Sequence, residues 1–182
     1  MDYYQQITLL PDPEFPETLL ISALIAKLHR ALHDVGEGEV GVSFPNLNKT
    51  LGSILRLHGT RDALERLESS NWYKGMRDHL DISQVDAVPE IKEWCQVKRR
   101  QPILSAAKVR RNIKRETYSE MEAEVIWANS TNKALEGPYA QLRSGSSGQT
   151  FRLYIEQLRG KNEVIGRFNS YGLSSEATVP WF

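Results

Sequence analysis

Cysteine is nearly absent from this chain of 182 residues, and its scarcity excludes two kinds of stabilising site. The single cysteine, Cys95, can form no disulfide within the chain and cannot supply a cysteine zinc site. Long apolar runs are missing as well, since none approaches the roughly 18 residues that span a bilayer. Asp2 stands where a signal peptide would carry cations. We therefore expect a reduced, cytoplasmic, globular protein that holds no metal, needs no cofactor and contacts no membrane.

A net charge is also missing, because 23 basic residues balance 23 acidic ones. The balance conceals a local excess, since the segment 96–115 contains eight basic residues and no acidic residue. The rest of the chain then has 15 basic against 23 acidic residues, a net charge of −8. This polarisation indicates one cationic surface that meets a polyanion. The eight cations are Lys98, Arg99, Arg100, Lys108, Arg110, Arg111, Lys114 and Arg115.

The second half of the basic segment has the pattern of an amphipathic helix. Ser105 is a suitable N-cap, and the five basic side chains over 108–115 cover an arc of about 160° on a helical projection. Val109 and Ile113 lie together on the opposite side. A solvated helix face usually mixes both signs of charge, and this run does not. The pattern therefore favours an arginine-rich helix that contacts nucleic acid over an ordinary solvated face.

The first half of the chain alternates strand and helix patterns. Apolar residues recur at helical spacing over 17–34, and Thr60 caps a second helix over 61–69. Between and around these helices, short apolar or alternating runs predict strands. The order strand, helix, strand, strand, helix, strand indicates a ferredoxin-like domain over 1–92, an arrangement that small RNA-binding domains often use. The predicted strands cover 4–10, 40–44, 52–58 and 85–88.

The second half predicts another α+β domain over 93–182, so the whole chain belongs to the α+β class. The basic segment opens this domain, and a helical stretch follows it until Gly137 and Pro138. A loop of small and hydroxyl residues over 143–149 separates two later strands. The terminal Val179–Phe182 is so apolar that we expect it to be docked rather than frayed. The predicted strands cover 139–142, 150–158 and 164–168.

Three side chains together can cleave RNA without a metal ion. His29 lies in the first predicted helix beside its apolar stripe, a position in which a histidine is more often structural. Ser144 belongs to the 143–149 loop, and Tyr171 precedes a glycine. RNA carries its own nucleophile, the 2′-hydroxyl. A histidine can take its proton, a serine can hold it and a tyrosine hydroxyl can orient the imidazole. The products of such a cut are a 2′,3′-cyclic phosphate and a free 5′-hydroxyl.

Other classes of function fit these residues less well. A serine hydrolase would place its nucleophile in a Gly-x-Ser-x-Gly turn between a strand and a helix, and Gly145–Gly148 has neither the spacing nor the context. A DNA-binding factor would need a helix-turn-helix or a dimer seam beside the arginine helix. An RNA-binding subunit that retains a hairpin without cutting it is the main alternative to an endoribonuclease.

Two residues near the end of the basic segment's first half have the chemistry of base readers. Arg99 and Gln101 are two positions apart, so in an extended chain their side chains point the same way. Arginine pairs with guanine and glutamine with adenine, each through two hydrogen bonds. The A-form major groove is deep, so this readout needs a short hairpin stem that is open near one end. Phe151 can stack on a terminal base or belong to the core of its strand.

Five motifs in order make the chain resemble the CRISPR-associated endoribonucleases of type I-F systems, which process precursor CRISPR RNA. The resemblance covers nearly the full length. The matching elements are Lys27–Leu32 with His29, Gly41–Pro45, the segment from Gln96 through the arginine helix, Leu142–Ser144 with Ser147–Gln149 and Phe151–Leu153, and Tyr171–Ser174 with the terminal Val179–Phe182.

The resemblance implies a metal-independent cut at the 3′ base of a CRISPR repeat hairpin. His29 is then the general base, Ser144 holds the attacking 2′-hydroxyl and Tyr171 orients the histidine. Arg99 and Gln101 read a G and an A near the base of the stem. The enzyme stays on its product as a subunit of the RNA-guided surveillance complex, so its partners are the hairpin and the other subunits. The remaining expected RNA contacts are Lys108, Arg110, Arg111, Lys114, Arg115, Ser146 and Phe151.

Overall fold

The protein is described by a computed structural model that covers residues 1–36, 38–101, 135–145 and 147–182. The chain divides into two compact units, of which the first contains nearly all described residues. The first unit is Met1–Arg99 with Gly137–Phe182, and the second is Arg100–Glu136. Six predicted RNA contacts lie outside the described residues, together with the predicted arginine-rich helix: Lys108, Arg110, Arg111, Lys114, Arg115 and Ser146.

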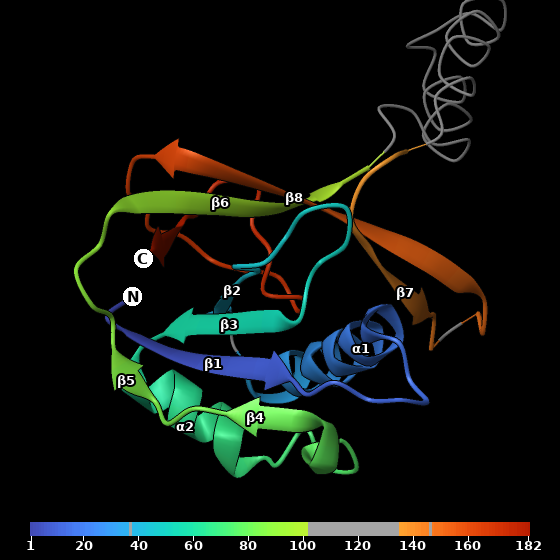
Figure 1. Cartoon of the computed structure of the whole chain (residues 1–182). Coiled ribbons are helices and arrows are strands. Elements are labelled where there is room, and N and C mark those ends of the chain that lie inside the picture. Colours follow the sequence, from blue (N-terminus) through green and yellow to red (C-terminus); the bar gives the residue numbers. More distant parts are fainter. Residues whose placement is uncertain (37, 102–134, 146) are drawn as a thin grey trace, which may run out of the picture. The chain divides into compact units, whose positions relative to one another are not determined.

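Two helices and two antiparallel sheets make up the described chain, which confirms the α+β class (Figure 1). The elements of the first half are β1 (Tyr3–Leu9), α1 (Glu17–Val35), β2 (Gly41–Ser43), β3 (Ile54–Gly59), α2 (Arg61–Ser69), β4 (Leu80–Ile82) and β5 (Asp86–Ala87). The first sheet has the order β2-β3-β1-β4, and each strand is antiparallel to its neighbours. The short β5 pairs with the start of β1. Helix α1 connects β1 to β2, and α2 connects β3 to β4.

The bounds of both helices agree with the predicted 17–34 and 61–69 to within one residue. The last strand of this half was predicted less well. Strand β4 follows a single 3-10 turn at Arg77–His79 and was not predicted, and only the two residues of β5 fall within the predicted 85–88. The physical reason is length, because β4 has three residues and buries only Leu80 completely, too few to show a period of two.

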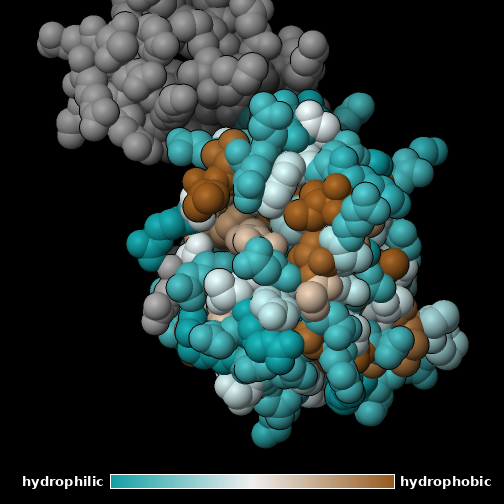
Figure 2. All heavy atoms as spheres, turned by 90° about the vertical axis from the view of Figure 1, so that its left-hand side faces the viewer, coloured by the Kyte–Doolittle hydropathy of each residue, from teal (hydrophilic) through white to brown (hydrophobic). Residues whose placement is uncertain are grey.

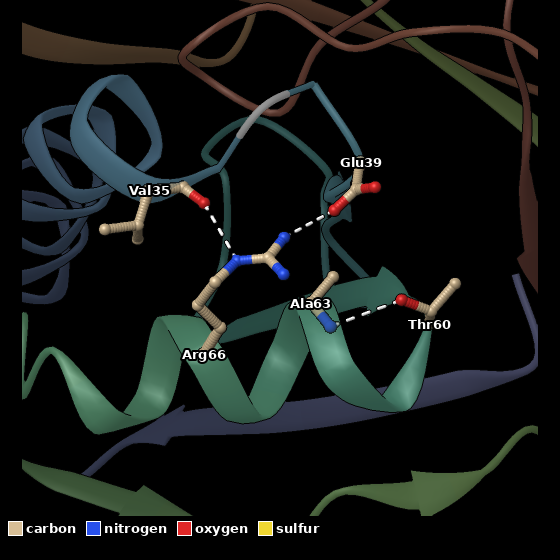
Figure 3. A network of polar contacts seen from close by, with 5 residues as sticks. All are labelled: Val35, Glu39, Thr60, Ala63 and Arg66. Carbon is tan, nitrogen blue, oxygen red and sulfur yellow. Dashed lines mark hydrogen bonds and ion pairs between the residues drawn. The ribbon is translucent and has the colours of Figure 1, made fainter.

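A polar network ties α2 to the chain that leaves α1 (Figure 3). The helix begins where the Thr60 hydroxyl accepts a hydrogen bond from the Ala63 amide at 3.2 Å, the expected cap. Further along α2, Arg66 donates from Nε to the Val35 carbonyl oxygen at 3.3 Å and forms an ion pair with Glu39. The pair is exposed and adds little stability by charge alone. Its contacts hold the end of α1, the helix that carries the candidate histidine.

The second sheet is built by β6 (Glu93–Arg100), β7 (Tyr139–Arg143), β8 (Thr150–Lys161) and β9 (Val179–Trp181), in the order β7-β8-β6-β9. Strands β7 and β8 confirm the predictions for 139–142 and 150–158, but the strand predicted over 164–168 is wrong. There the Val164 amide donates to the Thr178 hydroxyl at 2.8 Å instead of entering a ladder. Ile165 is 92% exposed. The apolar side chain of Ile165 therefore does not belong to the buried face of a strand.

The docked C-terminal tail is confirmed. Strand β9 pairs with β6, with Trp181 opposite Glu93. The Phe182 ring lies 4.0 Å from the guanidinium carbon of Arg56. Both chain ends lie on the left of Figure 1, and Figure 2 turns that side toward the viewer. Hydrophobic side chains on this face form small groups separated by hydrophilic ones (Figure 2).

The two sheets share one hydrophobic core. A glutamine of β8 joins them directly, because Gln157 accepts from the Phe44 amide at 2.9 Å and donates to the Phe44 carbonyl at 3.1 Å. This pair satisfies a backbone donor and acceptor just beyond the end of β2. The division into domains 1–92 and 93–182 stays a prediction. Within the described residues, no helix combines the length and the apolar character needed to cross a membrane.

Candidate active site

Helix α1 places His29 at the border of its buried stripe. Leu24, Leu28 and Leu32 are buried and hold the helix on the core, whereas His29 is half-buried and Arg30 is exposed. The apolar spacing that predicts the helix thus also leaves the imidazole accessible. A second contact holds α1 near β7, since the buried Ser22 hydroxyl accepts from the Gln141 amide at 3.0 Å.

A tight turn over 169–173 faces this histidine. The Asn169 carboxamide oxygen accepts from the amides of Tyr171 at 2.8 Å and Leu173 at 3.2 Å, as in an Asx turn. Gly172 has φ +72°, a left-handed conformation that favours glycine. Its carbonyl accepts from the Val42 amide at 3.0 Å, so the turn is fixed to β2. The asparagine and the glycine therefore account for the local shape.

The turn holds the imidazole of His29 in two ways. The Ser170 carbonyl lies 3.1 Å from Nδ1, and the Tyr171 ring stacks on the imidazole with centroids 3.9 Å apart and planes 5° apart. A carbonyl only accepts, so Nδ1 carries the proton of this hydrogen bond and the lone pair of the neutral ring is on Nε2. Sequence reasoning expected a tyrosine hydroxyl to orient the ring. The contacts that the structure shows are instead the flat face of the tyrosine and a backbone carbonyl.

Partial burial also raises the pKa of the Tyr171 phenol, and the positive charge of Arg99 opposes that shift. The phenol therefore stays protonated and neutral at physiological pH. The charge of Arg99 therefore acts on a residue of the turn over 169–173. Arg99 is exposed near the end of β6, and the exposed Gln101 follows that strand in the second unit.

The loop between β7 and β8 presents Ser144. The Ser144 amide donates to the Gln149 carbonyl at 2.8 Å, and the Gly148 amide donates back to the Ser144 carbonyl at 2.9 Å. The Ser144 hydroxyl also accepts from the Ser147 amide at 3.3 Å. Arg143 also contacts the end of the loop, because its Nε donates to the Gly148 carbonyl at 3.0 Å. These contacts within the loop define where the serine hydroxyl lies.

A cavity of about 380 Å³ joins the helix, the turn and the loop. Four residues expected to act in catalysis or stacking line it together: His29, Ser144, Phe151 and Tyr171. Phe151 is half-buried opposite Leu142 in the β7–β8 ladder and packs against the core. It therefore both belongs to its strand's packing and borders the cavity.

Two arginines that sequence reasoning did not single out line the same cavity, Arg30 and Arg143. Each is the direct sequence neighbour of an expected catalytic residue, and this adjacency is the sequence feature that could have identified them. Among the described residues, the lining offers an imidazole, two hydroxyls, two guanidinium groups and no carboxylate. Such a cavity suits an anionic group such as a phosphodiester. Among the described residues, no cluster of three or more His, Cys, Asp or Glu side chains could hold a metal ion.

Comparison with known proteins places the chain in a family. The family described as CRISPR-associated protein (Cas_Csy4) matches residues 4–182. The chain belongs to this family. Among curated proteins, the CRISPR-associated endonuclease Cas6/Csy4 of Escherichia coli (strain UTI89 / UPEC) is 44% identical over 186 residues, covering 100% of both chains. The protein of the same name from Pseudomonas aeruginosa (strain UCBPP-PA14) is 41% identical over 189 residues, again covering 100% of both. The elements that build the cavity all lie inside the part matched to the Cas_Csy4 family.

Proposed function

We propose that this Cas_Csy4 protein is an endoribonuclease that processes CRISPR RNA by cutting at the 3′ base of the repeat hairpin. Two full-length relatives named as CRISPR-associated endonucleases support the activity. One structural observation carries the assignment of the site. The His29 imidazole, held by the Ser170 carbonyl and the Tyr171 ring, lines the same cavity as Ser144.

The reaction uses the nucleophile that RNA supplies. His29 removes the proton of the 2′-hydroxyl through Nε2, the atom left with a lone pair by the hydrogen bond at Nδ1. The 2′-oxygen attacks the adjacent phosphorus, a P–O bond forms, and the bond from phosphorus to the 5′-oxygen breaks. The products are a 2′,3′-cyclic phosphate and a 5′-hydroxyl, whose oxygen takes up one proton. Ser144 holds the 2′-hydroxyl in line with the leaving oxygen.

The other cavity residues have supporting roles. Tyr171 keeps the imidazole plane fixed by stacking, so it acts through His29 rather than on the RNA. The guanidinium groups of Arg30 and Arg143 stabilise the negative charge that the phosphate gains as the 2′-oxygen attacks. This charge stabilisation lets the cut proceed without a metal ion.

Hairpin recognition is assigned to the basic segment and to one aromatic residue. Arg99 and Gln101 read a G and an A near the base of the stem, and Phe151 stacks beside the cut. The arginine-rich helix holds the phosphates of the stem. After the cut the protein stays on the hairpin and joins other subunits of a surveillance complex. The remaining proposed RNA contacts are Lys108, Arg110, Arg111, Lys114, Arg115 and Ser146.

The architecture proposed for hairpin binding and cleavage is an N-terminal ferredoxin-like domain followed by an RNA-binding domain. The strand order β2-β3-β1-β4, with α1 and α2 as the two helical connections, supports the first assignment. In this proposed architecture, His29 lies on the first helix of the N-terminal domain and the serine loop belongs to the second domain. The catalytic residues would then come from both domains.

A cleavage assay in EDTA separates this proposal from a subunit that only binds the hairpin. We expect a labelled repeat hairpin to be cut fully in EDTA and to leave a cyclic phosphate on the 5′ fragment. The same hairpin with a 2′-deoxy nucleotide before the scissile phosphate should bind equally well and stay intact. Tight binding without any cut of the all-ribose hairpin would establish the non-cleaving alternative. Cutting of the 2′-deoxy hairpin would refute the 2′-hydroxyl mechanism.

A further inference from the structure

The outer face of the β7–β8 hairpin carries a second group of side chains suited to RNA. Along β7 and over 152–156 of β8, buried residues alternate with residues that are exposed or half-buried. The ladder pairs Tyr139 with Tyr154 and Gln141 with Arg152, so these four side chains lie on one face. Arg143 follows on the same side of β7. We call this set the tyrosine–arginine face: Tyr139, Gln141, Arg143, Arg152 and Tyr154.

The groups on this face already stack on one another. The Arg152 guanidinium carbon lies 4.6 Å from the centroid of the Tyr139 ring, and the centroids of the two tyrosine rings lie 5.3 Å apart. Arg152 also donates to the Tyr154 hydroxyl at 3.5 Å. It forms no ion pair within the described part of the chain, and the face contains no acidic residue. The next outward residue of β8, Glu156, is paired with Lys98 at 3.1 Å. The result is a surface of cationic and aromatic groups that contains no anionic side chain of its own.

This face runs from the catalytic cavity to another hollow. Arg143 lines the cavity that contains His29, whereas Tyr139 and Gln141 line a separate cavity of about 320 Å³ together with Lys49 and Thr50. The two ends of β7 are roughly 13 Å apart at about 3.3 Å per residue. A chain that leaves the catalytic cavity along β7 would therefore reach a pocket with an aromatic ring, an ammonium group and side-chain hydrogen-bonding groups.

We propose that the tyrosine–arginine face binds the single-stranded RNA that adjoins the cleaved phosphate. Bases stack on aromatic rings and on guanidinium planes, and arginines on an exposed sheet contact the phosphates between them. The cavity beside Lys49 receives a nucleotide at the far end of the face. This inference rests on the proposed function, since it needs the phosphate to enter the cavity beside His29.

The position of this surface favours RNA over a protein partner, because the surface continues from the cavity that would take the phosphate. Its charged side chains are arginines, and its apolar area consists of two tyrosine rings rather than of aliphatic residues. Protein interfaces are also enriched in tyrosine and arginine, so the nearby phosphate site is what selects RNA. Stacking by arginine and tyrosine with little dependence on base identity is typical of single-stranded RNA binding.

Binding measurements on three uncleavable hairpins test the proposal. Each carries the 2′-deoxy nucleotide that blocks the cut. One has no extension, one a single-stranded 5′ extension of a few nucleotides and one an equal 3′ extension. For the wild-type protein, the 3′ extension, which continues from the cleaved phosphate, should tighten binding on the order of tenfold, the effect of stacking about one base. Arg152→Ala and Tyr139→Ala should each reduce that gain without changing affinity for the hairpin that lacks an extension.

Arg159→Ala is the matched control, because it removes an exposed cation from the other end of β8 that is paired with Glu93. It should retain the whole gain. Arg152→Lys keeps the charge but loses the planar group, so it should lose the share of the gain that comes from stacking. Unaltered affinity for the hairpin without extension shows that each variant is folded.

Each outcome has a defined meaning. No gain from the 3′ extension in the wild type, or the same gain in Arg152→Ala, would overturn the inference and favour a protein partner for this face. Equal weakening on all three hairpins would overturn it as well, because the face would then act on the hairpin itself. Failure of the wild type to bind any hairpin would instead refute the proposed function.

Discussion

Replacing Gly172 with alanine should damage the active site from a distance. Gly172 has φ +72°, and a Cβ atom added there would lie 2.5 Å from the Val42 Cγ1 atom and 3.3 Å from the Val42 amide nitrogen. The turn that contains Gly172 supplies both contacts to His29, from the Ser170 carbonyl and the Tyr171 ring. A methyl group at this position must therefore move the turn away from β2, and the imidazole loses its support.

The cost has two parts. An alanine in the left-handed region costs about 1–2 kcal/mol, and forcing a group into a packed site costs about 1–3 kcal/mol more. We therefore expect Gly172→Ala to lower the free energy of unfolding by about 2–5 kcal/mol. A displacement of about 1 Å at a catalytic group can slow a reaction on the order of 100-fold. Single-turnover cleavage under conditions where the variant is fully folded should fall by about that factor.

Gly75 offers a matched control because its φ is +80° but an added Cβ would meet nothing within 4 Å. Gly75→Ala should therefore cost only the backbone strain, and cleavage should stay at the wild-type rate. Val42→Ala removes the atom that clashes, so the double variant Gly172→Ala with Val42→Ala should recover part of the cleavage rate. Urea unfolding supplies the free energies, and a labelled hairpin supplies the rates.

Two results would refute this reasoning. If Gly172→Ala costs no more stability than Gly75→Ala, the contact with Val42 is not as tight as the geometry requires. If Gly172→Ala is strongly destabilised but cleaves at the wild-type rate when folded, the turn over 169–173 does not position His29.

Three further predictions follow from contacts elsewhere. Tyr171→Phe keeps the stacked ring and should cleave at nearly the wild-type rate, whereas Tyr171→Leu should be slow; equal losses in single-turnover assays would mean that the hydroxyl matters. Burial lowers the pKa of His58 to about 3, so only its neutral form suits the fold, and stability is lost as the pH falls below the unfolded value of about 6.5. Urea unfolding should show that wild-type stability falls between pH 7 and 4.5 by about 2.5 kcal/mol more than that of His58→Gln, and parallel curves would contradict this. Gln157→Leu leaves the Phe44 amide and carbonyl unpaired and should cost about 1–3 kcal/mol in the same assay, and no loss would mean that water replaces the amide.

Strong periodicity made the helices predictable from the sequence. The apolar stripe of α1 and the Thr60 cap of α2 are local signals, and both helices lie where those signals put them. Short elements lacked such signals. Strand β4 has three residues, and the apolar Val164 and Ile165 are exposed because the chain there runs outside any sheet. Their assignment depends on tertiary contacts that no local pattern contains.

The cavity was predictable only in part for a similar reason. His29, Ser144 and Tyr171 are far apart in the sequence, and they were named together from the chemistry of RNA cleavage and from the resemblance to a family. The structure adds that they line one cavity with Phe151. The Ser170 carbonyl could not have been named, because every residue has a backbone carbonyl and only the fold decides which one meets the imidazole. The ring stacking was missed because a tyrosine in a sequence draws attention to its hydroxyl.

One comparison tests the central claim most directly. It sets the single-turnover cleavage rate of His29→Ala on the all-ribose hairpin in EDTA beside the affinity of the same variant for the 2′-deoxy hairpin. We predict that cleavage is lost while hairpin affinity stays at the wild-type value, because the imidazole acts on the 2′-hydroxyl and α1 is held by its buried leucines without it. Cleavage at the wild-type rate would contradict the assignment of His29 as the general base. Loss of affinity together with cleavage would show that the histidine is structural.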